Sequence, residues 1–253
     1  MKGLIIKDLM CLKKNIRTFF FVAIATLVIS VMAVLSAKFG NIALLERVAE
    51  DNSSNVSPLE LLWFAISIMV MLPIMSVGDG ISGVFAADRN AGFAAVAGAM
   101  PVSVKKRVEA RYLSVLSMCG AGVSASLIIA VILSFFTDIM SIGEFVGLVL
   151  MASSVMLIFV AVEMVLIIAF NKASDYCGQL AFLIMCIAAG IVIAIKWNSI
   201  KQMIFELRVF DIAKAALNLF KDRWYIFALI AAVCLLFSYL TTVHLAERKR
   251  GVI

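Results

Sequence analysis

Few side chains in this sequence could carry chemistry in an apolar environment, and the clearest is Glu163. It lies within a long apolar run, seven residues before Phe170, which on a helix is roughly 10 Å from the end of the run. A carboxylate at that depth is costly unless it faces a polar cavity or a partner, or stays protonated. Two interpretations stay open: a residue of a transport path or proton site, and a neutral acid that hydrogen-bonds across a helix interface.

A second polar feature is the basic stretch over residues 78–111, which separates two long apolar runs. It reads GDGISG, then VFAADRNAGFAAVAG, then AMPVSVKKRVEAR. The part before Met100 can extend the preceding helix, Pro101 then breaks it, and Ser103 can cap the next helix. Such an elbow, joined to two helices, would transmit a push into both of them. The alternative is a plain surface loop with basic anchors.

The usual catalytic and metal-binding patterns are missing from the sequence. It contains no G-x-x-x-x-G-K-[ST] phosphate loop, no H-E-x-x-H and no G-x-S-x-G, so nothing predicts nucleotide hydrolysis or a hydrolase on this chain. The single histidine is His244, and the five cysteines show no pairing or metal pattern. We therefore expect no enzyme activity, no cofactor and no metal site on this chain.

Six apolar runs must position these polar features. The chain has 253 residues, of which 64% are hydrophobic and 15% are charged, whereas soluble domains average about a quarter charged. Each run is near the roughly 20 residues that a helix needs to cross a bilayer. We predict an all-α integral membrane protein, one domain over residues 1–253, with spans at 18–37, 58–77, 112–137, 145–170, 176–195 and 224–243.

The segments outside the spans indicate the orientation. Residues 1–17 place apolar residues on one helical stripe with lysines elsewhere, which predicts an amphipathic helix on the cytoplasmic headgroups. Residues 196–223 predict one or two short amphipathic helices on the outer side. With the N-terminus inside, the cytoplasmic segments hold 14 of the 22 Lys and Arg residues, so both termini are expected in the cytoplasm. The net charge of +6 is thus an orientation signal, and no nucleic-acid partner is expected.

The opening MKGLIIKDLMCLKKN and the element after the second span resemble the permease subunits of bacterial ABC-2 type exporters. Many of those permeases begin with a short basic helix and carry an "lPvsrkk.v..kyl" element. Val104 stands where a basic residue often precedes the lysine pair. In its pattern of spans and motifs, the chain is similar to small permeases that export phenol-soluble modulins or antimicrobial peptides. The residues that match the element are Met100, Pro101, Val102, Ser103, Lys105, Lys106 and Tyr112.

This resemblance implies a connecting helix near residues 2–16 and a coupling helix near residues 85–98. It also implies a separate ATPase subunit bound in two copies, which carries the ATP and Mg, and a second permease chain that is either identical or a paralogue. The setting would be a bacterial plasma membrane, with the chain in contact with lipid. The residues that would couple to the ATPase are Phe85, Asp88, Arg89, Asn90, Phe93, Met100, Pro101, Lys105 and Lys106.

The leading hypothesis is therefore a permease that exports amphipathic or hydrophobic cargo, peptides among them, with a partner's ATP. One alternative is a stand-alone secondary transporter or channel with Glu163 as its ion or proton site. Such transporters often show inverted repeats and broken helices, and the sequence shows neither signal. The other alternative is an assembly or sensing protein that has no cargo.

Overall fold

The computed structural model describes residues 2–39, 58–78, 84–85, 87–88, 90–91, 102–136, 141–170, 176–195 and 223–248. Within these ranges the elements are helices and no strand occurs. The helices are α1 (Lys2–Cys11), α2 (Lys13–Lys38), α4 (Pro58–Met75), α7 (Val104–Phe136), α8 (Ile142–Ala169), α9 (Cys177–Ile195) and α12 (Trp224–Arg248). The all-helical prediction is confirmed for this part of the chain.

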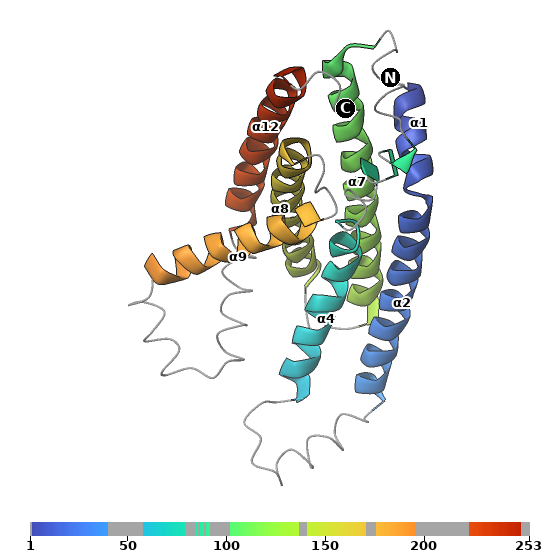
Figure 1. Cartoon of the computed structure of the whole chain (residues 1–253). Helices are drawn as coiled ribbons and strands as arrows, with labels where there is room; N and C mark the ends of the chain where they lie inside the picture. The colour runs from blue at the N-terminus through green and yellow to red at the C-terminus, as the bar shows by residue number, and fades with distance from the viewer. Residues whose placement is uncertain are drawn as a thin grey trace.

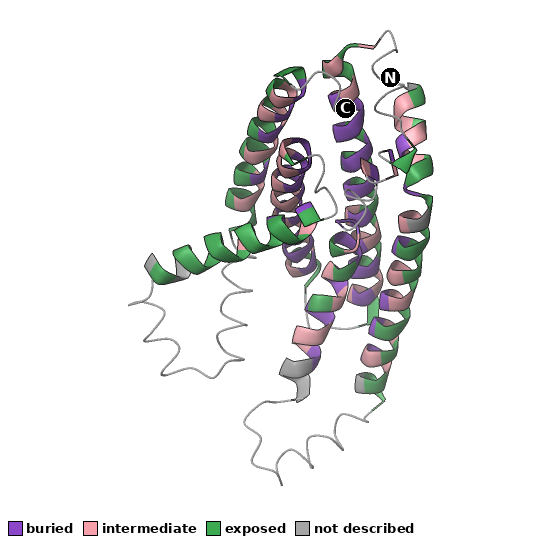
Figure 2. Cartoon of the chain, in the orientation of Figure 1, coloured by how far each residue is buried: buried purple, intermediate pink, exposed green. Residues whose placement is uncertain are grey.

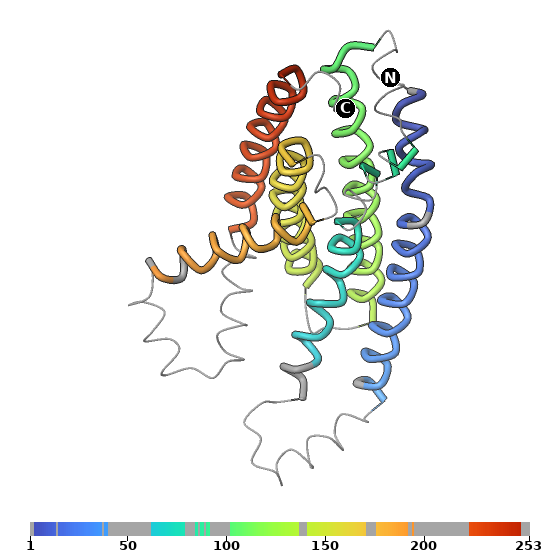
Figure 3. Tube along the Cα trace, in the orientation of Figure 1, coloured from blue at the N-terminus to red at the C-terminus, as the bar shows by residue number. Residues whose placement is uncertain are grey.

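The long helices run alongside one another, while α1 continues the line of α2 and α9 runs crosswise to the rest (Figure 1). Helical hydrogen bonds pass through the junction between α1 and α2, because Leu12 N donates to Asp8 O at 3.0 Å and Ile16 N to Leu12 O at 2.8 Å. The tube in Figure 3 shows that α1 and the last turns of α12 lie at the same end of the bundle. The two ends of the described chain thus share one side of the molecule.

The core lies along α7 and α8, which the other helices surround (Figure 2). Large side chains of α8 such as Phe145, Leu148 and Met164 are fully buried there. By contrast, α2, α9 and α12 turn many large apolar side chains outward, including Phe21 and Phe182. A helical bundle that has apolar side chains both in its core and on its outer surface is expected for a protein surrounded by lipid.

In the part of the chain that the structure describes, four helical stretches are long and apolar enough to cross a membrane: Asn15–Ser36, Val104–Phe136, Ile142–Ala169 and Trp224–Arg248. The apolar stretches Leu62–Met75 and Cys177–Ile191 are shorter. A six-span topology therefore stays a prediction. So do the outer helices over residues 196–223, which lie outside the described residues.

Two helices begin before the predicted span starts. α7 begins at Val104, ahead of the span start at residue 112, and the predicted cap is confirmed because Ser103 Oγ accepts a hydrogen bond from Lys106 N at 3.4 Å. α8 begins at Ile142, where Ser141 and Glu144 form a reciprocal capping box. The helices thus extend beyond the apolar runs into charged and polar sequence.

The predicted amphipathic helix at the N-terminus is present as α1, but its apolar stripe has a protein neighbour. Leu12 is buried, and Leu9 and Ile16 pack against the hydrophobic core; α1 lies against α7. The interfacial position on lipid headgroups stays a prediction. The structure shows instead that the stripe joins α1 to the bundle.

Candidate functional site

The candidate site is a cluster of four charged side chains where α1, residues 84–91 and α7 meet. Lys7 and Asp8 come from α1, Asp88 from the segment after α4, and Arg111 from the third turn of α7. We call these four residues the charge cluster. Lys7 and Asp88 are 81 positions apart in the chain, and Asp8 and Arg111 are 103 positions apart, so only the fold brings these partners together.

Each basic side chain of the charge cluster forms ion pairs with both acidic side chains. Lys7 Nζ lies 2.8 Å from both carboxylate oxygens of Asp88 and 3.2 Å from Asp8 Oδ1. Arg111 donates from Nη1 to Asp8 Oδ1 at 2.7 Å, and its Nη2 pairs with Asp88. Two different donors of one guanidinium thus bind carboxylates from two different segments, which is a use of the fixed fork of arginine.

The charge cluster is largely withdrawn from solvent. Asp8 is 2% exposed, Arg111 8% and Asp88 9%, while the Lys7 side chain is 26% exposed. Two positive and two negative charges make the group neutral, so burial leaves no unbalanced charge. Taking one partner away from such a group is far more costly than removing a balanced pair.

The local helical geometry explains why residues 84–91 reach the charge cluster. Phe85 and Asp88 are three positions apart and so share one face of a helical turn. Asp88 binds the Arg111 guanidinium from the side, and the Phe85 ring lies 4.8 Å from its Cζ. A cation over an aromatic face is attracted to it. Val84 on the same segment is buried, so this face points into the bundle.

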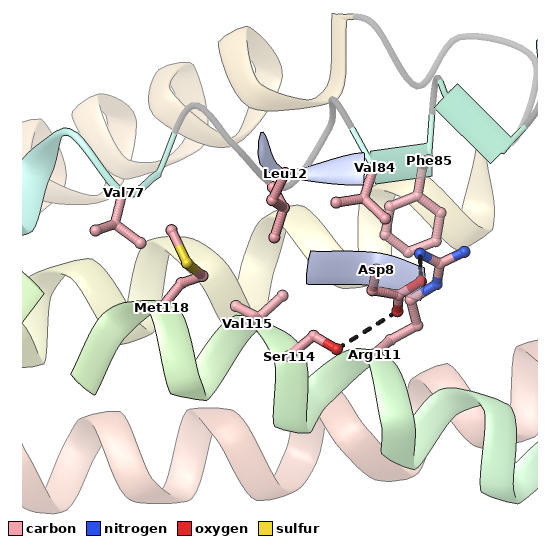
Figure 4. A pocket seen from close by; sticks show the side chains of 9 residues that line it. All are labelled: Asp8, Leu12, Val77, Val84, Phe85, Arg111, Ser114, Val115 and Met118. Carbon is pink, nitrogen blue, oxygen red and sulfur yellow. Dashed lines mark hydrogen bonds and ion pairs between the residues drawn. The ribbon is translucent and has the colours of Figure 1, made fainter. Parts of the chain in front are cut away.

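A small cavity of about 20 Å³ adjoins the charge cluster, as Figure 4 shows. Its polar wall is formed by Asp8, Arg111 and Ser114, and Ser114 Oγ donates to Asp8 Oδ2 at 3.5 Å. The remaining wall is apolar, with Leu12 and Phe85 among its residues. The volume suits about one water molecule.

Burial lowers the pKa of the Lys7 amine, and the nearby positive charge of Arg111 lowers it further. The Asp8 carboxylate acts in the opposite direction, because it stabilises the charged amine. The acidic neighbour Asp8 thus opposes the lowering of the Lys7 pKa. Without it, the two effects that lower the pKa of Lys7, burial and the charge of Arg111, would act with less opposition.

The structure divides the predicted coupling residues into two groups. Phe85 and Asp88 contact Arg111 of α7, and Asp88 also contacts Lys7 of α1, within this chain; their contact with an ATPase stays a prediction. Asn90 is exposed, as are Lys105 and Lys106 on the first turn of α7. Their contact with a partner stays a prediction. Arg89, Phe93, Met100 and Pro101 lie outside the described residues.

Sequence reasoning missed Lys7, Asp8 and Arg111 as members of the site. A signal was present for Asp8, since it lies four positions before Leu12 and is therefore on the side of α1 that faces the bundle. Arg111 directly precedes the predicted span start at residue 112, so it was counted only as an orientation charge. Neither residue reveals its partner by sequence spacing.

Glu163 is 1% exposed on α8 and lies against the first turn of α9. A Cβ added to Gly178 would lie 3.3 Å from Glu163 Oε1, so glycine at this position lets the carboxyl group approach the helix. The N-terminal end of a helix favours a negative or hydrogen-bond-accepting neighbour. This placement favours the interpretation of an acid at a helix interface. A role in a transport path stays a prediction.

Comparison with known proteins gives one family. A family model described as ABC-2 family transporter protein matches residues 53–247, which is most of the chain. No curated protein and no solved structure matches the chain.

Proposed function

Since the chain belongs to the ABC-2 family of transporter proteins, we propose that it exports amphipathic or hydrophobic cargo, with amphipathic peptides as first candidates. A permease of an ABC-type transporter and a multi-pass membrane location follow from the family and the apolar helices. An ATPase partner follows in general terms as well. The cargo, two ATPase copies, a second permease chain and cytoplasmic termini are our proposal.

The observation that carries the proposal is the charge cluster. Asp88 belongs to the segment that the family resemblance assigns to ATPase coupling, and it holds Lys7 of α1 and Arg111 of α7 at once. A movement of this segment would therefore displace α1 and α7 together. α1 continues into α2 through the hydrogen bonds at Leu12, so the movement would reach one long helix on each side.

Ion pairs transmit a movement between Asp88 and the helices α1 and α7 better than apolar contacts would. Apolar side chains can slide past one another at small cost, whereas a buried carboxylate that loses its cation is left as an uncompensated charge. The Phe85 ring against Arg111 adds an orientation to the contact. Phe85 and Asp88 are thereby held in place relative to Arg111 of α7.

In this proposal the segment has an inner and an outer face. Phe85 and Asp88 hold it from the inside, and Arg89, Asn90 and Phe93 contact the ATPase from the outside. The exposure of Asn90 supports this division. The basic side chains Lys105 and Lys106, which are also exposed, would lie at the edge of the same contact.

The cargo class is proposed from the surface of the helices. A groove between α8 and α12 is lined mainly by apolar side chains such as Val165 and Phe237, with the hydroxyl-bearing Ser238 and Thr241 at its wall. Both hydroxyls already donate to backbone carbonyls of the chain, so the groove offers mainly its apolar lining, which the apolar face of an amphipathic segment would match. A strongly charged or sugar-like cargo would leave the apolar lining unmatched.

The first experiment is co-purification of the tagged chain from its native membrane under gentle extraction. We expect a soluble ATPase in equimolar amount, and we expect it to be lost when Arg89→Ala and Phe93→Ala are combined. The matched control combines Arg223→Ala with Tyr225→Ala, which removes one arginine and one exposed aromatic near the start of α12. Recovery of the chain alone in every extraction would contradict the proposed partner.

A further inference from the structure

The residue after Arg111 makes a second polar contact, on another side of α7. Tyr112 Oη lies 2.6 Å from Ser238 Oγ and 3.1 Å from Thr242 Oγ1, both on α12. Successive residues of a helix point about 100° apart. Arg111 and Tyr112 therefore reach different neighbours from the same turn, and both side chains are buried.

The donors in this contact can be assigned because each hydroxyl has only one hydrogen. Ser238 Oγ donates to the backbone carbonyl of Ala161 on α8 at 2.6 Å. Its oxygen must then accept from Tyr112, whose oxygen in turn accepts from Thr242. The result is one chain of hydrogen bonds, Thr242 to Tyr112 to Ser238 to Ala161 O, which joins α7, α12 and α8.

This chain crosses between two groups of helices. α8 and α12 make the most extensive contact of any helix pair in the described structure, while α1, α2 and α4 all pack on α7. Figure 1 shows the two groups next to each other, with α7 facing α8 and α12. The Tyr112 ring also packs edge to face against Tyr239 of α12, with 5.6 Å between the ring centroids. An aromatic contact thus lies beside the hydroxyl contact.

We propose that Tyr112 is a positioning residue that passes movement of the coupling segment from α7 to α8 and α12. This inference rests on the proposed function, because it requires a driven movement at Asp88. Arg111 receives that movement from Asp88, and Tyr112 is the next residue of α7, so the helix backbone joins the two rigidly. The directional hydroxyl contact then ties α7 to the pair α8 and α12, which apolar packing alone would allow to slip.

The test uses the permease in complex with its co-purified ATPase and needs no identified cargo. Hydrogen–deuterium exchange is measured with and without ATP trapped by vanadate. In the unchanged complex, we expect a nucleotide-dependent change in exchange in α1 and in the half of α12 that carries Ser238 and Thr242. Tyr112→Phe keeps the ring but removes the hydroxyl, and we expect it to reduce the change in α12 about threefold or more while α1 responds as before.

Two further variants sharpen the result. Ser117→Ala removes a hydroxyl of α7 that donates to the Ser114 carbonyl of the same helix at 2.7 Å, and we expect a normal response in α12. Thr242→Val removes only the first link of the chain and keeps the side-chain shape, so we expect a smaller reduction than with Tyr112→Phe. Should Tyr112→Phe fail to assemble with the ATPase, Thr242→Val carries the test.

A normal response of α12 in Tyr112→Phe, or in Thr242→Val where that variant carries the test, overturns the inference. Exchange in α12 that rises equally with and without nucleotide also overturns it, because that is the result of a purely structural contact. Failure of the proposed function gives a different pattern. In that case the unchanged complex shows no nucleotide-dependent change in α1, or no ATPase is recovered at all.

Discussion

At the scale of single residues, Arg111 is the centre of the molecule's polar interior. Its guanidinium binds Asp8 of α1 and Asp88 of the segment after α4, and it lies against the Phe85 ring. The contribution of such a buried charge cluster to the free energy of unfolding depends more on the balance of its charges than on the number of its contacts. A substitution that unbalances the charge cluster should therefore cost more than one that removes a pair.

Replacing Arg111 by methionine tests this dependence. Arg111→Met leaves two carboxylates with one partly exposed amine, and we expect a loss of about 3 kcal/mol in stability. Adding Asp88→Leu restores neutrality, and we expect the double variant to recover most of the loss. The measurement is the unfolding temperature in detergent, followed by reaction of the buried thiols of Cys119 and Cys177 with a fluorogenic maleimide in a background where Cys11, Cys186 and Cys234 are replaced by serine. A double variant less stable than Arg111→Met would refute the charge-balance argument.

Glu163 is the residue that separates the ATP-driven permease from a stand-alone proton-coupled transporter. Its carboxyl group lies at the first turn of α9, where the end of the helix favours a hydrogen-bond acceptor, and the amide oxygen of glutamine can also accept. We expect Glu163→Gln to keep the complex intact, with ATPase activity within about twofold of the unchanged protein. Loss of transport with unchanged ATPase coupling would instead favour the proton-site alternative.

At the scale of helices, α4 and α7 meet at a close crossing that depends on Gly122. A Cβ at this position would lie 3.0 Å from Val77 Cγ2, 3.3 Å from Ile74 Cα and 3.4 Å from Pro73 O. Two of these neighbours are backbone atoms of α4, which cannot rotate away. Small residues permit such approaches between helices in lipid, where packing drives association.

Gly122→Ala and Gly120→Ala form a matched pair on α7. We expect Gly122→Ala to lower stability by about 1 to 3 kcal/mol, because the backbone of α4 must move. At Gly120 an added Cβ meets nothing within 4 Å, and alanine should be neutral or gain about 0.5 to 1 kcal/mol from its higher helix propensity. Both are measured by the same thiol-reactivity unfolding curve. Equal effects at the two positions would show that the crossing is not tight.

The helices themselves were largely readable from the sequence. Apolar run length predicts the stretch 58–77 where α4 covers Pro58–Met75, and the start of α12 at Trp224. Run length fails at the start of α7, where Lys105, Lys106 and Arg107 end the apolar signal but not the helix. The charge cluster could not be read at all, because its partners are far apart in the chain and no periodicity links them.

At the scale of the whole molecule, the described chain has a polar end and an apolar body. The charge cluster lies between α1 and the start of α7, and the last turns of α12 lie at the same end (Figure 3). Both ends of the described chain thus lie on one side of the bundle, and the cytoplasmic location of that side stays a prediction from the distribution of Lys and Arg. One helix departs from the common direction, since α9 lies crosswise to the others and exposes most of its side chains (Figure 2).

Cysteine accessibility decides both the orientation and the course of α9. Cys11 at the end of α1 and Cys186 in the middle of α9 are exposed in the structure, so each can be studied as the single cysteine of a variant. In membrane vesicles of known sidedness, we expect a membrane-impermeant maleimide to label Cys11 only from the cytoplasmic face. If α9 spans the bilayer, Cys186 lies roughly 14 Å from the first residue of the helix and stays unlabelled from either face. Labelling of Cys186 would mean that the crosswise course of α9 persists in the membrane and that the chain has fewer than six spans.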